Sequence, residues 1–150
     1  MIQHKMVVPY METARAFAKL SKAKRLKVGA IAITPQDVML YSYNGRPAGD
    51  DNNCELRVVI DDYRGSELVT HPEVLHAEAN LVAKAAREGI SLKGSTVFTT
   101  ASPCLPCALQ LFQAGVSSVV YDQEYRLTDG IDFLRRKKIH CEKYEEESNE

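Results

Sequence analysis

The segment that decides the fold is STVFTTASPCLPCALQLFQAGVSSVVY at residues 95–121. Residues 96–100 and 116–121 are short runs rich in β-branched side chains, and each predicts a strand. Between them, residues 104–114 have helical spacing, and Gly115 is the residue type that most often ends a helix. A strand, a helix and a second strand in this order predict a βαβ unit with parallel strands.

The same alternation continues on both sides of this unit. It predicts an α/β protein with a mostly parallel sheet that carries helices on its faces. Residues 44–53, NGRPAGDDNN, are so rich in turn formers that they predict a loop, and a loop of this length is usually functional. The other predicted elements are a helix at 10–21 beginning after Pro9, a hairpin of strands at 28–33 and 38–43, a helix at 77–87 ending before Gly89, a helix at 129–137 and a weak strand at 139–144.

Composition limits the classes of function. The chain has 150 residues, 45% of them hydrophobic, which fits one domain at residues 1–150. Its 19 Lys and Arg against 20 Asp and Glu give a net charge of −1, which disfavours nonspecific binding to nucleic acid. No stretch approaches the ~20 apolar residues of a membrane span. Four cysteines are too few for a disulfide scaffold, so we expect a reducing compartment, the cytoplasm.

The charge is unevenly distributed along the chain. Residues 1–30 contain seven bases and one acid, a local charge of +6. The acidic tail at about 142–150 is expected to extend into solvent. The basic run at 135–138 lies at the end of a predicted helix, where cations are favoured without any nucleic acid.

Two motifs carry the chemistry. His76 and Glu78 open one predicted helix, and Cys104 and Cys107 open the next. One imidazole and two thiolates give Zn²⁺ three protein ligands and leave a fourth position for water, which is typical of a catalytic site. An acid at Glu78 is placed to exchange protons with that water and with a substrate nitrogen. The motifs therefore predict a catalytic zinc site.

Other interpretations use the same cysteines. Cys-Leu-Pro-Cys after a strand is also typical of a thioredoxin-like redox motif, which the upstream His-x-Glu disfavours. A structural zinc would need a fourth ligand, for which Cys54 and Cys141 are available, but it would leave Glu78 without a role. We interpret Cys54 and Cys141 as ordinary thiols.

Taken together, these motifs resemble those of the deoxycytidylate (dCMP) deaminases, zinc-dependent members of the cytidine deaminase superfamily. The resemblance covers roughly residues 19–139. The interval 55–75 is too short for the cysteine- and histidine-bearing insertion that binds a second zinc in some relatives, so one zinc per chain is expected. The similar segments are SKAKRLKVGA at 21–30, YNGRPAGDDNNC at 43–54, HAEAN at 76–80, SPCLPCA at 102–108 and YDQEY at 121–125.

The resemblance implies a fold, an assembly and a reaction. The fold is a three-layer α/β/α arrangement with a five-stranded mixed sheet, and the assembly is a homo-oligomer, commonly a hexamer. The reaction is the hydrolysis of dCMP to dUMP and ammonia, which supplies the precursor of thymidylate. In that scheme His76, Cys104 and Cys107 bind zinc, hydroxide attacks C4 of cytosine, and Glu78 moves protons to N3 and to the departing ammonia.

The resemblance also implies how the substrate is bound. The Ala77 backbone and the Ser102 carbonyl would flank the base, and Asn44 would hold the sugar hydroxyl. A phosphate needs cations and hydroxyls around it. The candidates for that role are Arg25, Lys27 and Tyr125.

Members of the family are often activated by dCTP and inhibited by dTTP, together with Mg²⁺. The resemblance places that regulatory site in the loop after residue 43. Asp50 and Asp51 add acid there, which would serve a metal but repel a bare triphosphate. The residues expected to contribute are Asn44, Gly45, Arg46, Asn52, Asn53 and Glu55.

Two rival functions share the zinc motifs. A deaminase acting on tRNA or single-stranded DNA would gather bases and exposed aromatics, whereas this chain has no Trp and a net charge of −1. A catalytically inactive, zinc-stabilised nucleotide-binding protein would have no need of Glu78. We therefore expect a small-molecule deaminase that binds neither nucleic acid nor membrane.

Overall fold

The protein is built around one mixed β-sheet. The computed structural model describes residues 2–146. Its elements in chain order are α1 (His4–Ala18), β1 (Gly29–Ile33), β2 (Met39–Tyr43), β3 (Glu55–Asp61), β4 (Gly65–Thr70), α2 (Ala77–Glu88), β5 (Thr96–Ala101), α3 (Leu105–Gln113), β6 (Ser118–Gln123), α4 (Asp129–Arg136) and β7 (His140–Lys143).

Five strands form the main sheet in the order β2-β1-β5-β6-β7. The predicted βαβ unit is confirmed, because β5 and β6 are parallel and α3 connects them. β7 is also parallel to β6, whereas β1 is antiparallel to both β2 and β5. The prediction of a mostly parallel sheet is therefore wrong. A short turn joins β1 to β2, and such a connection permits only antiparallel pairing.

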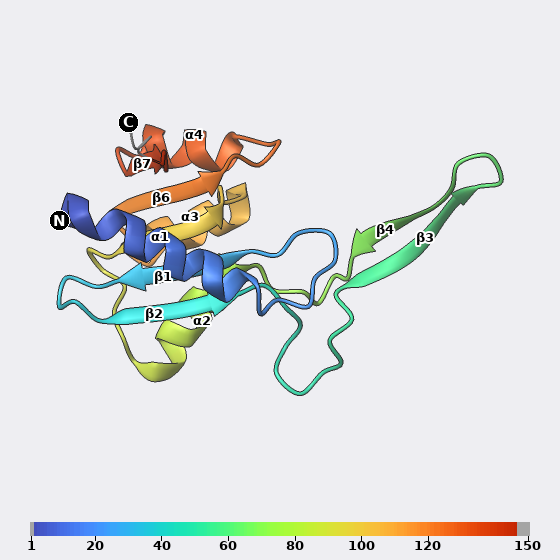
Figure 1. Cartoon of the computed structure of the whole chain (residues 1–150), viewed down its shortest axis with the longest axis horizontal. Helices are drawn as coiled ribbons and strands as arrows, with labels where there is room; N and C mark the ends of the chain where they lie inside the picture. The colour runs from blue at the N-terminus through green and yellow to red at the C-terminus, as the bar shows by residue number, and fades with distance from the viewer. Residues whose placement is uncertain (1, 147–150) are drawn as a thin grey trace.

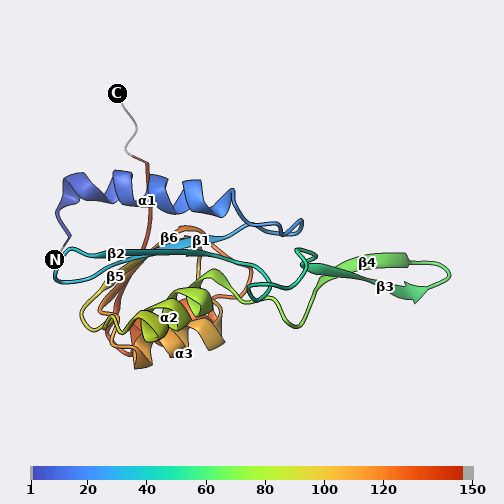
Figure 2. The same ribbon diagram turned by 90° about the horizontal axis from the view of Figure 1, so that it is seen from below.

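Helices cover both faces of this sheet, as Figure 2 shows, with α1 on one face and α2 and α3 on the other. Successive side chains of each strand point to opposite faces of the sheet. On β5, Phe98 packs with Met11 of α1, whereas Val97 packs with Leu81 of α2 and Leu111 of α3. α4 adds Ile131 to the α2–α3 side. The three-layer α/β/α fold with a five-stranded sheet is thus confirmed.

α1 begins earlier and ends earlier than predicted. It starts at His4, so Pro9 lies inside the helix although the sequence placed it at the beginning. Ile2, Met6 and Val7 continue the apolar stripe upstream and pack against the core, which offsets the hydrogen bond that a proline removes. The helix ends at Ala18 because the next segment is held elsewhere: the hydroxyl of Ser21 donates to the Asn44 carbonyl at 2.9 Å.

A second, two-stranded sheet lies at residues for which no strand was predicted. β3 and β4 form an antiparallel hairpin that projects from the body of the protein (Figure 1). Leu56, Val58 and Ile60 alternate along β3, and the Gly65 turn with φ +71° reverses the chain, so the sequence signal was present. The hairpin leaves large apolar side chains in solvent, including Val59 at 76% exposure and a fully exposed Tyr63 at its tip.

The C-terminal segment is fastened to α1. The Arg15 guanidinium donates to both carboxylate oxygens of Asp122 on β6, at 2.8 and 3.0 Å, and to Glu146 at 2.7 Å. It also lies over the ring of the buried Tyr144, 5.2 Å from the centroid. The predicted tail from about 142 is therefore anchored at Tyr144 and Glu146, whereas Glu142, Lys143, Glu145 and Glu146 are exposed to solvent as expected. The rest of that tail, 147–150, lies outside the described residues.

Candidate active site

The ends of two helices bring the three predicted metal ligands together. His76 is the N-cap of α2, Cys104 is the N-cap of α3, and Cys107 lies in the first turn of α3. His76 Nδ1 lies 3.3 Å from Cys104 Sγ and 3.5 Å from Cys107 Sγ. In tetrahedral zinc with ordinary Zn–S and Zn–N lengths, the S to N edges are about 3.5 Å. The geometry therefore fits one zinc ion held by three ligands.

No fourth ligand from residues 2–146 joins this cluster. Within residues 2–146, His76, Cys104 and Cys107 are the one group of histidine, cysteine and acidic side chains close enough to share an ion. Cys54 and Cys141 are free, buried thiols outside the cluster, although Cys54 lines the adjoining cavity, and burial raises the pKa of each. A zinc ion held by these three residues would keep a fourth position for water, as a catalytic zinc requires.

The two cysteines share a proton when the thiols are metal-free. A hydrogen bond from Cys107 lowers the pKa of Cys104 to about 4, and His76 adds to the effect. The same hydrogen bond raises the pKa of Cys107. Cys104 is therefore the thiolate of the pair, and a bound metal would take the proton from Cys107 as well.

Glu78 lies beside the cluster, in the first turn of α2. Its side chain is buried, and burial raises the pKa of the carboxyl above its usual range. The hydroxyl of Thr99 on β5 lies 3.0 Å from Glu78 Oε1. A buried carboxyl with a raised pKa next to a metal ligand set is suited to both accept and donate a proton.

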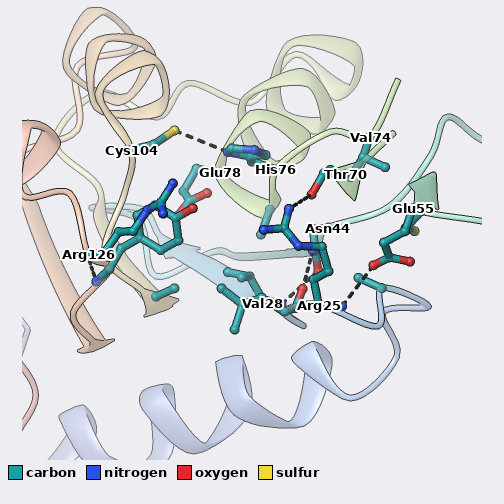
Figure 3. Close-up of a pocket in the computed structure, with 17 residues that line it drawn as sticks. Arg25, Val28, Asn44, Glu55, Thr70, Val74, His76, Glu78, Cys104 and Arg126 are labelled. Atoms are coloured by element: carbon teal, nitrogen blue, oxygen red, sulfur yellow. Dashed lines mark hydrogen bonds between the residues drawn. The ribbon is translucent and has the colours of Figure 1, made fainter. Parts of the chain in front are cut away.

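A cavity of about 420 Å³ opens onto these residues (Figure 3). Of the predicted substrate residues, it is lined by Arg25, Asn44, Ala77, Ser102 and Tyr125. Lys27 instead lines a smaller neighbouring cavity beside Arg15. Arg126, which was not among the predicted residues, also lines this cavity and directly follows Tyr125.

Asn44 fixes the backbone that forms one wall of the cavity. Its Oδ1 accepts from the Val28 N–H at 2.9 Å, and its Nδ2 donates to the Leu26 carbonyl at 2.8 Å. On the opposite side, the hydroxyl of Ser102 accepts from the Tyr125 N–H at 2.7 Å. Both walls are thus held by side chain to backbone hydrogen bonds.

The base of the hairpin closes the far end of the cavity. Glu55 Oε1 accepts from the backbone N–H groups of Lys24 and Arg25, at 2.7 and 3.1 Å. Arg25 Nη1 donates to the Thr70 hydroxyl at 3.0 Å. Glu55 was expected at a regulatory site. It instead lines this cavity and holds the backbone of the segment that carries Arg25.

A second cavity of about 550 Å³ lies on the other side of the loop at 44–53. Of the residues expected at a regulatory site, Asn44, Gly45, Arg46 and Asn52 line it, whereas Asn53 and Glu55 do not. Arg46 is paired with Asp51 at 3.0 Å and with Glu73 at 3.2 Å. The cations that sequence reasoning did not name here are Lys22, Lys84 and Arg87.

No helix within residues 2–146 has both the length and the apolar character needed to cross a bilayer. The basic run at 135–138 packs onto the protein itself: Arg136 lies over Phe133 and Lys137 over Phe112. Arg135 donates to the Cys141 carbonyl at 3.1 Å. Three of the four cations in the run therefore contact the protein itself.

Comparisons with known proteins agree with this geometry. The family model of the cytidine and deoxycytidylate deaminase zinc-binding region matches residues 5–123. The chain is 34% identical to the deoxycytidylate deaminase of Mycobacterium phage D29, over 77% of this chain and 92% of that one. It is 28% identical to ComE operon protein 2 of Bacillus subtilis, over 78% of this chain, and spans 59% of that protein's length.

A solved structure is similar over nearly the whole chain. The dCMP deaminase of the cyanophage S-TIM5, crystallised with dCMP and dUMP, matches 96% of this chain and 100% of that one, with 40% identity and a TM-score of 0.84. The match includes the three layers described above. The ligand set, the adjacent buried acid and these similarities lead to one conclusion: the chain belongs to the deoxycytidylate deaminase family, within the zinc-dependent cytidine deaminase superfamily.

Proposed function

We propose that the chain hydrolyses dCMP to dUMP and ammonia. The observation that carries the proposal is a single cavity lined by His76, Cys104, the buried Glu78 and Arg25. Cys107 completes the metal-ligand cluster beside it. The metal ligands and Glu78 are placed to act on a nucleobase. The guanidinium of Arg25 is suited to bind a phosphate. The complex of the similar S-TIM5 enzyme with dCMP and dUMP supports the same substrate and product.

Glu78 performs the proton transfers in this proposal. When held by His76, Cys104 and Cys107, zinc supplies an acidified water molecule as the nucleophile. Glu78 accepts a proton from the attacking water and passes it to N3 of the cytosine ring. It then carries the second proton of the water to the departing amino group, which leaves as ammonia while the ring retains the oxygen.

The other lining residues hold the nucleotide. The backbone of Ala77 and the carbonyl of Ser102 flank the base, and Asn44 binds the sugar hydroxyl. Arg25, with Tyr125, binds the phosphate, and Arg126 adds a second guanidinium to the same cavity. Lys27 is left out of this set because it lines a different cavity.

The proposal is tested by measuring ammonia release from cytidine, dCMP, dCTP and a cytosine-containing oligonucleotide side by side. We expect turnover of dCMP far above that of the other three. Turnover of the oligonucleotide alone would instead favour the tRNA or single-stranded DNA deaminase, and absence of turnover with zinc bound would favour the inactive nucleotide-binding protein.

We further propose that dCTP activates and dTTP inhibits the enzyme at the second cavity, with Mg²⁺ bound near Asp50 and Asp51. Cations suited to a triphosphate, including Lys84 and Arg87, line this cavity and support the proposal. Saturation curves for dCMP should shift to lower substrate concentration with dCTP and to higher concentration with dTTP. Superimposable curves would contradict the regulation but not the deamination.

Finally, we propose a homo-oligomer, a hexamer, formed by single-domain chains in the cytoplasm, where the product serves as the precursor of thymidylate. The exposed hairpin supports the assembly, because a two-stranded hairpin is marginally stable alone and this one leaves Val59 and Tyr63 in solvent. The free cysteines support a reducing compartment. Light scattering of the purified protein measures the number of chains.

A further inference from the structure

A buried hydroxyl lies behind Glu78, on the face of the sheet that packs against α2 and α3. Thr99 on β5 is fully buried, and its partners across the sheet are Ala30 on β1 and Tyr121 on β6. Both partners belong to the core cluster that packs against α2 and α3, so Thr99 faces that cluster too. A buried hydroxyl is costly unless it is hydrogen-bonded, so its bonding partners indicate why it is there.

Those partners are a carboxylate and a carbonyl. Thr99 Oγ1 lies 3.0 Å from Glu78 Oε1 and 2.9 Å from the Ala101 carbonyl oxygen on its own strand. The hydroxyl has one hydrogen, so it donates to the charged Glu78 carboxylate, and when it donates to Ala101 instead, the neutral Glu78 carboxyl donates to it. The threonine side chain is β-branched and therefore stiff, and β5 lies in the middle of the sheet. Glu78, in contrast, has three rotatable side-chain bonds. The rigid partner of this hydrogen bond is Thr99.

The contact constrains only one end of the carboxylate. Thr99 binds Oε1, whereas Oε2 has no hydrogen bond from another side chain in the part of the chain that is described. Glu78 also lines the cavity that contains the metal ligands. A carboxylate held by one oxygen presents the other in a fixed direction.

We propose that Thr99 is a positioning residue for Glu78, holding Oε1 so that Oε2 faces the reacting water and base. The inference rests on the proposed deamination, in which Glu78 moves the protons. Proton transfer needs heavy atoms within hydrogen-bond reach, and a displacement of about 1 Å can lower a rate on the order of 10²-fold.

The test compares Thr99→Val, which has nearly the same shape without the hydroxyl, with Thr99→Ser, which retains it. We expect Thr99→Val to lower kcat by about 10- to 100-fold while KM for dCMP, zinc content and the Kd for dUMP stay within about twofold of wild type. Thr99→Ser should recover most of the lost kcat. Thr96→Val, at the other end of β5 and outside the cavity, is the matched control and should leave kcat unchanged.

A double-mutant cycle shows whether Thr99 acts through Glu78. In a Glu78→Gln background, Thr99→Val should cause little further loss of the residual rate. An equal loss in both backgrounds would overturn the proposal, as would a kcat for Thr99→Val within about twofold of wild type. If Thr99→Val unfolds or loses zinc, Thr99→Ala replaces it under the same criteria.

The wild-type enzyme separates the two hypotheses. If wild type does not release ammonia from dCMP, the proposed function is wrong. If wild type is active and the Thr99 variants are equally active, deamination stands and only the positioning role is wrong.

Discussion

Gly130, in the first turn of α4, packs directly against the backbone that carries a metal ligand. A Cβ at this position would lie 2.1 Å from the Pro103 carbonyl oxygen and 2.9 Å from that of Cys104. An ordinary contact begins near 3.4 Å, so Gly130→Ala requires α4 and the Cys104 loop to separate by 1.3 Å, the difference between 3.4 and 2.1. Backbone atoms cannot rotate away as a flexible side chain can.

Two effects of Gly130→Ala can be estimated. Overpacking of this kind costs about 1–3 kcal/mol, which for a chain of this size lowers Tm by about 2–12 °C. Metal-ligand distances tolerate deviations of only about 0.2 Å, so displacement of Cys104 should weaken zinc binding by at least about tenfold.

The assays are thermal unfolding of the zinc-loaded protein and competition for zinc against a chromophoric chelator. Gly45→Ala is the matched control for both measurements, because a Cβ there meets nothing within 4 Å. If Gly130→Ala binds zinc as tightly as Gly45→Ala and unfolds at the same temperature, the close packing of α4 on the ligand loop is refuted.

Three further predictions concern Glu78 and the hairpin. Glu78→Ala should retain zinc and fold but lower kcat by orders of magnitude, and unchanged turnover of dCMP would contradict its role in proton transfer. Burial raises the pKa of Glu78 above its ordinary value of 4.5. In zinc-free protein, the bound proton therefore stabilises the fold fully below pH 4.5, and this stabilisation is lost as the pH rises through the folded-state pKa. Glu78→Gln should therefore raise urea stability relative to wild type more at pH 7 than at pH 4, and equal differences at both pH values would argue against the shift. Replacing Val59 and Tyr63 together with serine should reduce the mass measured by light scattering toward the 16.8 kDa of one chain, whereas an unchanged mass would remove the hairpin tip from the interface.

Local patterns in the sequence were sufficient to predict the central unit and the ligands. The spacing of Cys104 and Cys107 places both in one helical turn, and His76 and Glu78 open the preceding helix, so each pair is set by its own local structure. Such local patterns could not predict the contact between Thr99 and Glu78. Glu78 lies 21 residues away from Thr99 on another element, and only the packing of α2 on β5 brings them together.

Tertiary contacts also explain the elements that were wrongly placed. The extra turns of α1 form because Met6 and Val7 have a core to pack against, although Pro9 weakens the local helix. The acidic tail is held at Glu146 by a hydrogen bond from Arg15, which lies 131 residues earlier in the sequence, on α1. Glu55 lines the active-site cavity and not the predicted regulatory site, because its carboxylate accepts hydrogen bonds from the backbone N–H groups at 24–25.

The contacts of Arg15 also have a consequence for synthesis on the ribosome. Its partner Glu146 is 131 residues downstream, an interval that takes roughly 7–26 s to translate at typical rates. Asp122, on β6, emerges only shortly before. During elongation, Arg15 therefore lacks both of these carboxylate partners. The contact between Arg15 and Glu146 forms only after residue 146 has been synthesised.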